Sequence, residues 1–142
     1  MEYAFWDSSA LVPLCVEQDA TPQAESLAER YRMMVWWAAP VEMRSAFARL
    51  LRMGQITSKG RVEAQIALEG LRAVWREVEP GPALREQAER LIERFPLRAA
   101  DALQLAAALT WRMGRPQGRV FVSGDLPLLE AARELGFTGM EI

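Results

Sequence analysis

Histidine is absent from this chain of 142 residues, and cysteine and lysine occur once each, as Cys15 and Lys59. Without histidine there is no imidazole ligand for zinc and no serine or cysteine triad that uses histidine as its base. A single cysteine excludes an intrachain disulfide and a thiolate-rich metal site. Any chemistry must use carboxylates, hydroxyls, arginines and bound metal, and oxygen ligands favour hard ions such as Mg²⁺ or Mn²⁺.

Long apolar runs are absent as well. No stretch of about eighteen apolar residues could span a bilayer, and residues 1–3 lack the basic segment that opens a signal peptide. Hydrophobic residues make up 51% of the chain and charged residues 25%, which is ordinary for a folded globular protein. We therefore expect a cytoplasmic protein without a membrane partner, formed by one domain over residues 1–142.

A net positive charge is also lacking. The net charge is -2, whereas nucleic-acid-binding proteins usually carry a basic face. Every basic residue except Lys59 is arginine, a side chain suited to bidentate phosphate contact but equally common in surface ion pairs. A compositional preference for arginine is the simpler explanation of this excess.

Hydrophobic periodicity predicts short strands that alternate with longer helices, the pattern of a parallel α/β sheet. Strands are expected at residues 3–6, 33–36 and 119–122, with shorter ones within 73–78 and 137–142. Helices are expected just after residue 7 and at 21–32, 40–53, 58–71, 84–95, 101–111 and 127–135. The predicted fold class is α/β, with a central, mostly parallel sheet of about four to five strands flanked by helices.

Four carboxylates share one position relative to these elements. Asp7, Glu42, Asp101 and Asp125 each stand where an apolar or loop segment gives way to a helix. Side chains at the carboxyl ends of strands in an open α/β sheet converge on a crevice. Four acids in a partly dehydrated crevice repel one another unless cations neutralise them, so the pattern predicts a divalent-metal pocket.

A simpler role explains each acid taken singly. Asp and Glu are favoured near helix N-termini because they cap free N–H groups and interact well with the helix dipole. Asp7 and Asp125 both look like N-caps, so either one alone is as readily a cap as a ligand. The joint placement of all four acids is what favours a metal site.

The segments around these acids closely resemble the motifs of PIN-domain nucleases, and most of all VapC-type toxins of bacterial and archaeal toxin–antitoxin pairs. The four segments occur in the family's order and spacing, and they span nearly the whole chain. They are FWDSSALV at residues 5–12, VEMRSA at 41–46, LRAADALQLA at 97–106 and FVSGDLPLLEAA at 121–132. The resemblance implies a PIN-like domain that acts as a Mg²⁺- or Mn²⁺-dependent endoribonuclease.

By this resemblance the four acids form the catalytic, metal-binding quartet. Asp7, Asp101 and Asp125 would be ligands, directly or through water, and Glu42 either a ligand or the base that orients a water. The sequence departs from the family pattern before Glu42, where residues 39–40 are Ala-Pro, and after Asp125, where Pro127 replaces a more usual polar residue. These departures concern the local loops and leave the acids intact.

Four neighbouring residues have supporting roles in the same interpretation. Ser8 and Ser123 occupy hydroxyl positions of the family and would orient a carboxylate or a metal-bound water, although a local cap or turn explains them equally well. Arg44 and Arg98 lie near two of the acids in the sequence. They would contact phosphate or pair with a carboxylate, but an ordinary surface ion pair is the favoured explanation.

The resemblance also implies an RNA substrate, an antitoxin whose C-terminal segment covers the cleft, and a homodimer. The Met- and Trp-rich segment 33–37 and the helix at 58–71 could offer a groove to a partner helix, but core packing is expected, with Trp37 the most exposed residue of that segment. Two other functions stay open. One is a PIN-type nuclease outside toxin systems, and the other is a non-catalytic binding module whose acids cap helices or bind Mg²⁺ structurally.

Overall fold

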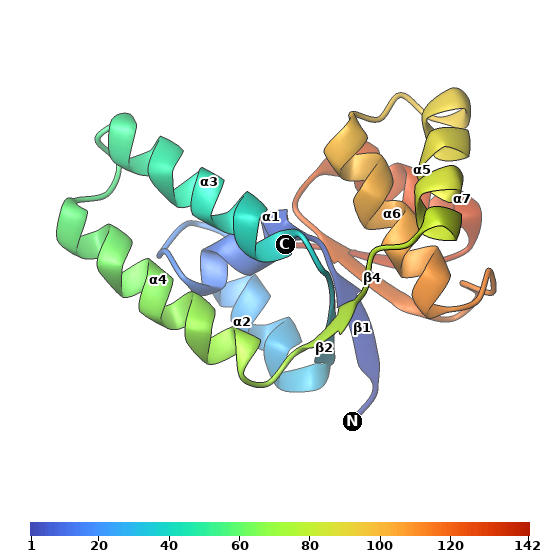
Figure 1. Ribbon diagram of the computed structural model, residues 1–142. Coiled ribbons are helices and arrows are strands. Elements are labelled where there is room, and N and C mark those ends of the chain that lie inside the picture. Colours follow the sequence, from blue (N-terminus) through green and yellow to red (C-terminus); the bar gives the residue numbers. More distant parts are fainter.

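A five-stranded, all-parallel sheet runs through the centre of the protein, described here by a computed structural model of residues 1–142 (Figure 1). The strand order is β3-β2-β1-β4-β5, so the chain moves outward from β1 in one direction and later returns to β1's other side. The strands are β1 (Tyr3–Trp6), β2 (Arg32–Trp36), β3 (Arg76–Val78), β4 (Val120–Ser123) and β5 (Thr138–Glu141). The α/β prediction with a parallel sheet is confirmed.

Helices cover both faces of this sheet, as parallel crossover connections require. One group lies beside β1 and β2, and α5, α6 and α7 form a second group on the other side of the sheet (Figure 1). The helices are α1 (Ser8–Leu11), the 3₁₀ turn η1 (Val12–Leu14), α2 (Thr21–Arg30), α3 (Ala39–Arg52), α4 (Ser58–Arg72), α5 (Pro82–Arg94), α6 (Ala99–Trp111) and α7 (Leu126–Leu135).

Strand β1 is buried on both faces and separates two apolar cores. Phe5 belongs to the core under α5, α6 and α7, while Ala4 and Trp6 belong to the core under α1 to α4. This division follows from the alternation of side chains along a strand. Phe5 also stacks on Phe121 of β4, with ring centroids 5.3 Å apart, which helps to fix the register of the two strands.

The register of β1 and β4 determines where the first and last acidic segments lie. Trp6 pairs with Val122, and the backbone N–H of Asp7 donates to the carbonyl of Val122 at 3.0 Å. The residue after β1 therefore lies beside the end of β4. This is the point at which the direction of the chain across the sheet reverses, where ligands bind in open α/β folds.

The strand predicted within residues 73–78 begins later than expected. Ala73 and Trp75 donate backbone hydrogen bonds to the last carbonyls of α4, and Val74 has 73% of its surface exposed. These residues therefore extend the last turn of α4 instead of forming a strand, and only Arg76–Val78 pairs with β2. The other boundaries differ from the predicted ones by a few residues at most.

The buried faces of α3 and α4 are narrow. Helix α3 buries Met43, Phe47 and Leu50, whereas Val41 is exposed. In α4 the exposed residues include Ile66. These two helices pack through one narrow stripe each, so some of their apolar residues lie outside it. None of the helices combines the length and the hydrophobicity that a membrane-spanning helix requires.

Candidate active site

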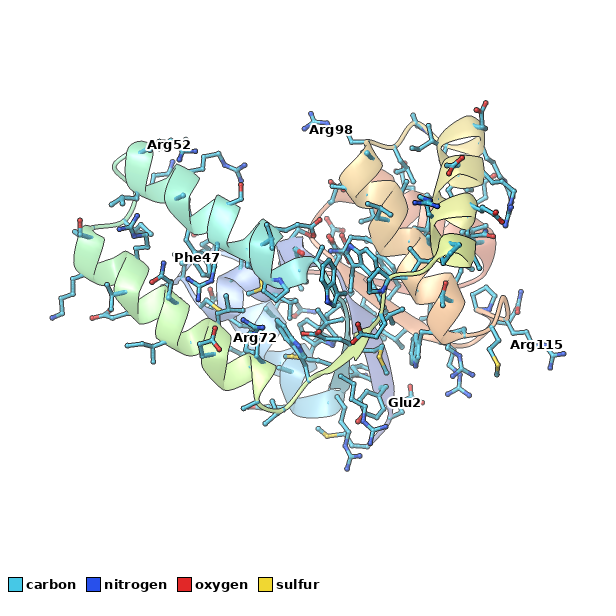
Figure 2. All side chains as sticks on the ribbon, in the orientation of Figure 1. Glu2, Phe47, Arg52, Arg72, Arg98 and Arg115 are labelled. Atoms are coloured by element: carbon cyan, nitrogen blue, oxygen red, sulfur yellow. The ribbon has the colours of Figure 1, made fainter.

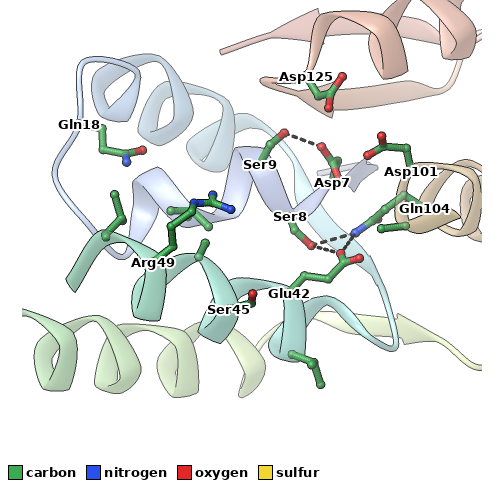
Figure 3. A pocket seen from close by; sticks show the side chains of 15 residues that line it. Asp7, Ser8, Ser9, Gln18, Glu42, Ser45, Arg49, Asp101, Gln104 and Asp125 are labelled. Carbon is green, nitrogen blue, oxygen red and sulfur yellow. Dashed lines mark hydrogen bonds between the residues drawn. The ribbon is translucent and has the colours of Figure 1, made fainter. Parts of the chain in front are cut away.

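The four predicted acids all line one cleft, which has a volume of about 620 Å³ (Figure 3). Asp7 follows β1, and Asp125 follows β4, the strand that pairs with β1. Glu42 lies in the first turn of α3, and Asp101 in the first turn of α6. Residues separated by more than a hundred positions in the sequence therefore meet at the carboxyl edge of the sheet.

Asp7 is the most buried of these acids, with only 5% of its surface exposed. Its Oδ2 atom accepts hydrogen bonds from Ser123 Oγ, at 2.9 Å, and from Ser9 Oγ. Burial raises the pKa of Asp7 to about 6; the two serine bonds lower it, and the charges of Glu42 and Asp101 raise it further. Burial therefore disfavours the ionised form of the Asp7 carboxyl group, and a nearby cation would stabilise that form.

Glu42 is held by two donors from different elements. Its Oε1 atom accepts from Ser8 Oγ at 2.6 Å and from Gln104 Nε2 at 2.6 Å (Figure 3). Gln104 Nε2 also donates to Ser8 Oγ at 2.8 Å, which closes a triangle of polar contacts between α1, α3 and α6. Ser8 thus orients a carboxylate, but that of Glu42 and not that of its neighbour Asp7.

Asp101 and Asp125 occupy the side of the cleft formed by α6 and α7. Burial and the nearby charge of Asp125 raise the pKa of Asp101. Asp125 caps α7, because its Oδ1 atom accepts from the backbone N–H of Leu128 at 3.1 Å. Asp7, by contrast, makes no side-chain cap for α1. Helix capping therefore accounts for one carboxylate oxygen of Asp125, but it does not account for Asp7.

The architecture around this cleft is that of known proteins. No protein-family model and no curated protein sequence matches the chain. A toxin–antitoxin complex from Klebsiella pneumoniae superposes with a TM-score of 0.63 at 15% identity, over 86% of each chain. VapBC2 from Rickettsia felis, bound to a DNA fragment from its promoter, gives 0.65 at 12% identity over 98% of both chains. FitAcB from Neisseria gonorrhoeae gives 0.66 at 13% identity, over 99% of this chain and 97% of the other.

The fold is PIN-like and matches that of these structures. The chain shares its topology with these structures over 86–99% of its length, which confirms the expected fold. At such low identity the likeness concerns the fold alone, and the activity must be argued from the side chains of the cleft.

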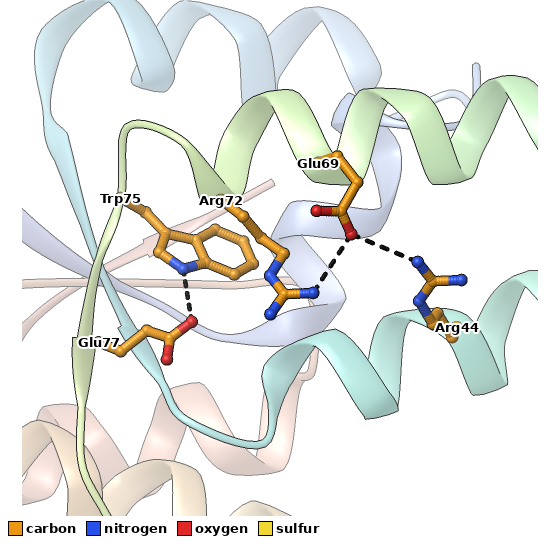
Figure 4. A network of polar contacts seen from close by, with 5 residues as sticks. All are labelled: Arg44, Glu69, Arg72, Trp75 and Glu77. Atoms are coloured by element: carbon orange, nitrogen blue, oxygen red, sulfur yellow. Dashed lines mark hydrogen bonds and ion pairs between the residues drawn. The ribbon is translucent and has the colours of Figure 1, made fainter.

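The two arginines named from the sequence, Arg44 and Arg98, have different environments in the structure. Arg44 does not line the acid cleft. It pairs with Glu69 of α4 at 3.3 Å, and Arg72 contacts the same carboxylate at 3.2 Å (Figure 4). Arg44 is therefore a surface ion pair, as the simpler explanation held. Arg98 forms no ion pair, but its positive charge lowers the pKa of Asp101, which places it near that carboxylate.

Sequence reasoning missed several polar residues of the cleft. Gln104 is 1% exposed and contacts Glu42, and its only sequence signal is a lone amide within the apolar run LQLAAAL. Ser9 is a second such residue: nothing in the sequence distinguishes it from Ser8, but of the two serines it is Ser9 that donates to Asp7. Arg49 lines the cleft from α3, seven residues after Glu42, a spacing that returns to the same helix face.

The donor set of the cleft fits a hard divalent cation in chemical type. It offers carboxylate, hydroxyl and amide oxygens, and Gln104 Oε1 is a buried acceptor without a hydrogen-bond partner. No three acidic side chains converge closely enough to surround a single ion. Mg²⁺ does not need three, because it is commonly held by one or two carboxylates and keeps several waters. Whether the acids are ligands thus remains a prediction.

Proposed function

We propose that this PIN domain is a metal-dependent endoribonuclease that hydrolyses phosphodiester bonds of RNA, and that it acts as the toxin of a toxin–antitoxin pair. The observation that carries the proposal is the grouping of Asp7, Glu42, Asp101 and Asp125 around one cleft. The raised pKa of Asp7 supports the proposal, since a bound cation strongly stabilises the ionised form of a buried carboxyl group. RNA as the substrate follows from the family resemblance.

Asp7, Asp101 and Asp125 would hold Mg²⁺ or Mn²⁺ in this account, some of them directly and the others through bound water. When bound, the ion supplies positive charge that polarises the scissile phosphate and makes a water more acidic. The protein's own contribution is placement. Asp7 is fixed by Ser9 and Ser123 at the floor of the cleft.

Glu42 orients and deprotonates the attacking water in the proposed reaction. Ser8 and Gln104 both bond Oε1, which leaves Oε2 free to accept a proton. The water oxygen forms a bond to phosphorus as the bond to the leaving oxygen breaks, and that oxygen takes a proton from solvent. Because the donors to Glu42 come from two helices, the carboxylate is held before the substrate arrives, which favours a general base.

Metal-dependent cleavage of a mixed single-stranded RNA pool tests this function. The purified protein, free of any partner, is assayed with Mg²⁺, with Mn²⁺ and with EDTA, and the products are resolved on a denaturing gel. We expect internal cleavage with either ion and none with EDTA. Cleavage that persists in EDTA would contradict the metal role, and no cleavage under any condition would favour the non-catalytic binding module.

The toxin role includes two protein partners, an antitoxin that covers the cleft and a second copy of this chain. It is supported by the fold shared with proteins from toxin–antitoxin complexes. We expect growth arrest when the chain is expressed alone, and a dimer by light scattering at micromolar concentration. An unaffected culture that contains active nuclease would point to a PIN-type nuclease outside toxin systems, and a strict monomer would contradict the homodimer.

A further inference from the structure

Arg49 is the only basic residue that lines the acid cleft. It projects from α3 into the part of the cleft that also contains Gln18 and Ser45 (Figure 3). Seven residues of helix place it about 10 Å from Glu42 along the axis of α3. Its guanidinium makes no ion pair or side-chain hydrogen bond, so it faces the cleft with its charge unneutralised by a carboxylate.

Arg98 has a matching position on the other side of the acids. It lines a second hollow of about 460 Å³, which shares Asp101 and Asp125 with the acid cleft. The two hollows therefore adjoin at these acids and form one groove. Arg98 precedes α6 and projects beyond the start of that helix, and it too makes no ion pair (Figure 2).

The order of charges along the groove is thus one arginine, four acids and one arginine. A nucleic-acid strand carries a phosphate at every nucleotide, and each phosphate that lies near unneutralised carboxylates is repelled. Guanidinium groups bind phosphate through two parallel N–H donors. Because Arg49 lies about two helical turns from Glu42, it is placed for a neighbour of the scissile phosphate and not for that phosphate itself.

We propose that a single RNA strand lies along this groove, with its scissile phosphate at the acids, one flanking phosphate on Arg49 and another on Arg98. The proposal rests on the proposed ribonuclease function and adds the path of the substrate. It requires a strand that extends on both sides of the cut, so cleavage is internal and a dinucleotide is a poor substrate.

Salt-dependent binding measures these two contacts without cleavage. The Asp7→Asn chain in the presence of Mg²⁺ is titrated with a short fluorescent single-stranded RNA, by anisotropy over a series of salt concentrations. Each phosphate contact contributes about 0.7 to the slope of log affinity against log salt for single strands. We expect Arg49→Gln and Arg98→Gln each to lower the slope by about 0.7, the double variant by about 1.4, and each single variant to bind about tenfold more weakly at low salt.

Arg115→Gln is the matched control, because it removes the same charge from an exposed residue beyond the far end of α6. The length of α6 places Arg115 about 20 Å from Arg98 (Figure 2). Its slope should equal that of the parent chain, and Arg49→Lys should retain most of the slope because it keeps the charge. Equal slopes for Arg49→Gln and Arg115→Gln would overturn the proposed path.

Kinetics of the otherwise unaltered chain distinguish this proposal from the function on which it rests. Contacts made equally in substrate and transition state change KM and leave kcat unchanged. We expect Arg49→Gln to raise KM about tenfold with little change in kcat. Normal KM in this variant, with metal-dependent cleavage intact, overturns the strand path alone. Absence of cleavage in the unaltered chain removes the proposed function and the path with it.

Discussion

Gln104 holds Glu42 and Ser8 together: its Nε2 atom donates to Glu42 Oε1 at 2.6 Å and to Ser8 Oγ at 2.8 Å. The amide comes from α6, the carboxylate from α3 and the hydroxyl from α1. A buried amide that fixes a carboxylate in this way positions the proposed base.

Replacement of Gln104 by methionine is expected to lower kcat about 10- to 100-fold, the range typical for partners that orient catalytic ligands. Methionine keeps the volume of the side chain and removes the unpartnered Oε1, so the melting temperature should change little. Gln18→Met is the control, since the side chain of Gln18 lines the cleft but bonds none of the acids. Equal kcat in both variants would contradict the role of Gln104.

Replacement of Asp7 by asparagine is expected to stabilise the metal-free protein at neutral pH. The pKa of Asp7 rises from 3.8 to about 6 on folding, chiefly through burial. Between about pH 4 and pH 6 the folded chain holds more protons than the unfolded chain, so stability falls as pH rises through this window and stays lower above it. Asp7→Asn removes this loss, which amounts to about 1–3 kcal/mol above pH 6 and vanishes below about pH 4.

Urea unfolding in EDTA at several pH values measures this difference. A gain that is the same at pH 4 and pH 7 would contradict burial of the Asp7 charge as its cause. Added Mg²⁺ should then stabilise the unaltered chain more than the Asp7→Asn variant, because a ligand at free concentration L stabilises the folded state by RT ln(1 + L/Kd), which is larger for the protein that binds it more tightly. Equal stabilisation of the two proteins by Mg²⁺ would remove Asp7 from the proposed metal site.

Replacement of Ser9 by alanine is expected to raise the pKa of Asp7, since the Ser9 hydrogen bond lowers it. Cleavage requires the charged carboxylate in this account, so the acid limb of the pH–rate profile should move to higher pH in Ser9→Ala. The measurement is kcat/KM against pH for both proteins at saturating Mg²⁺. An unchanged acid limb, with cleavage preserved, would show that Asp7 does not control this limb.

Replacement of Arg44 by glutamine is expected to leave cleavage unchanged. Arg44 pairs with Glu69 on the surface, and both side chains are about half exposed, so the pair contributes at most about 1 kcal/mol to stability. A change in KM comparable to that expected for Arg49→Gln would show that the RNA also contacts the outer face of α3.

The sequence was sufficient to predict the parallel α/β fold and the segments that carry the acids. The strand β4 is a nearly continuous apolar run around Phe121, which is typical of a buried parallel strand. The end of α7 is predictable because Gly136 adopts the left-handed conformation that glycine favours after a helix. The position of Asp125 at the same edge of the sheet as Asp7 was also predictable, because a strand that runs parallel to β1 ends at the same edge.

The partners of the acids could not be predicted in the same way. Whether Ser8 or Ser9 bonds Asp7 depends on the direction in which the short helix α1 leaves the sheet, and adjacent residues on a helix point about 100° apart. Gln104 lies within an apolar stretch of α6, and its contact with Glu42 of α3 depends on how the two helices are placed at the edge of the sheet. The exposed Val74 shows the same limit, since tertiary contacts decide where a helix ends.

The central claim is that the four acids of this cleft cut RNA with the help of a metal ion, and a comparison of two carboxylate variants tests it most directly. Asp101→Asn alters an acid of the cleft, and Asp19→Asn makes the same chemical change at an exposed residue outside it. Both are assayed with the unaltered chain for Mg²⁺-dependent cleavage of the same RNA pool, after circular dichroism has confirmed that they are folded. The account predicts full activity for Asp19→Asn and no detectable cleavage for Asp101→Asn. Equal cleavage by the two folded variants would contradict it.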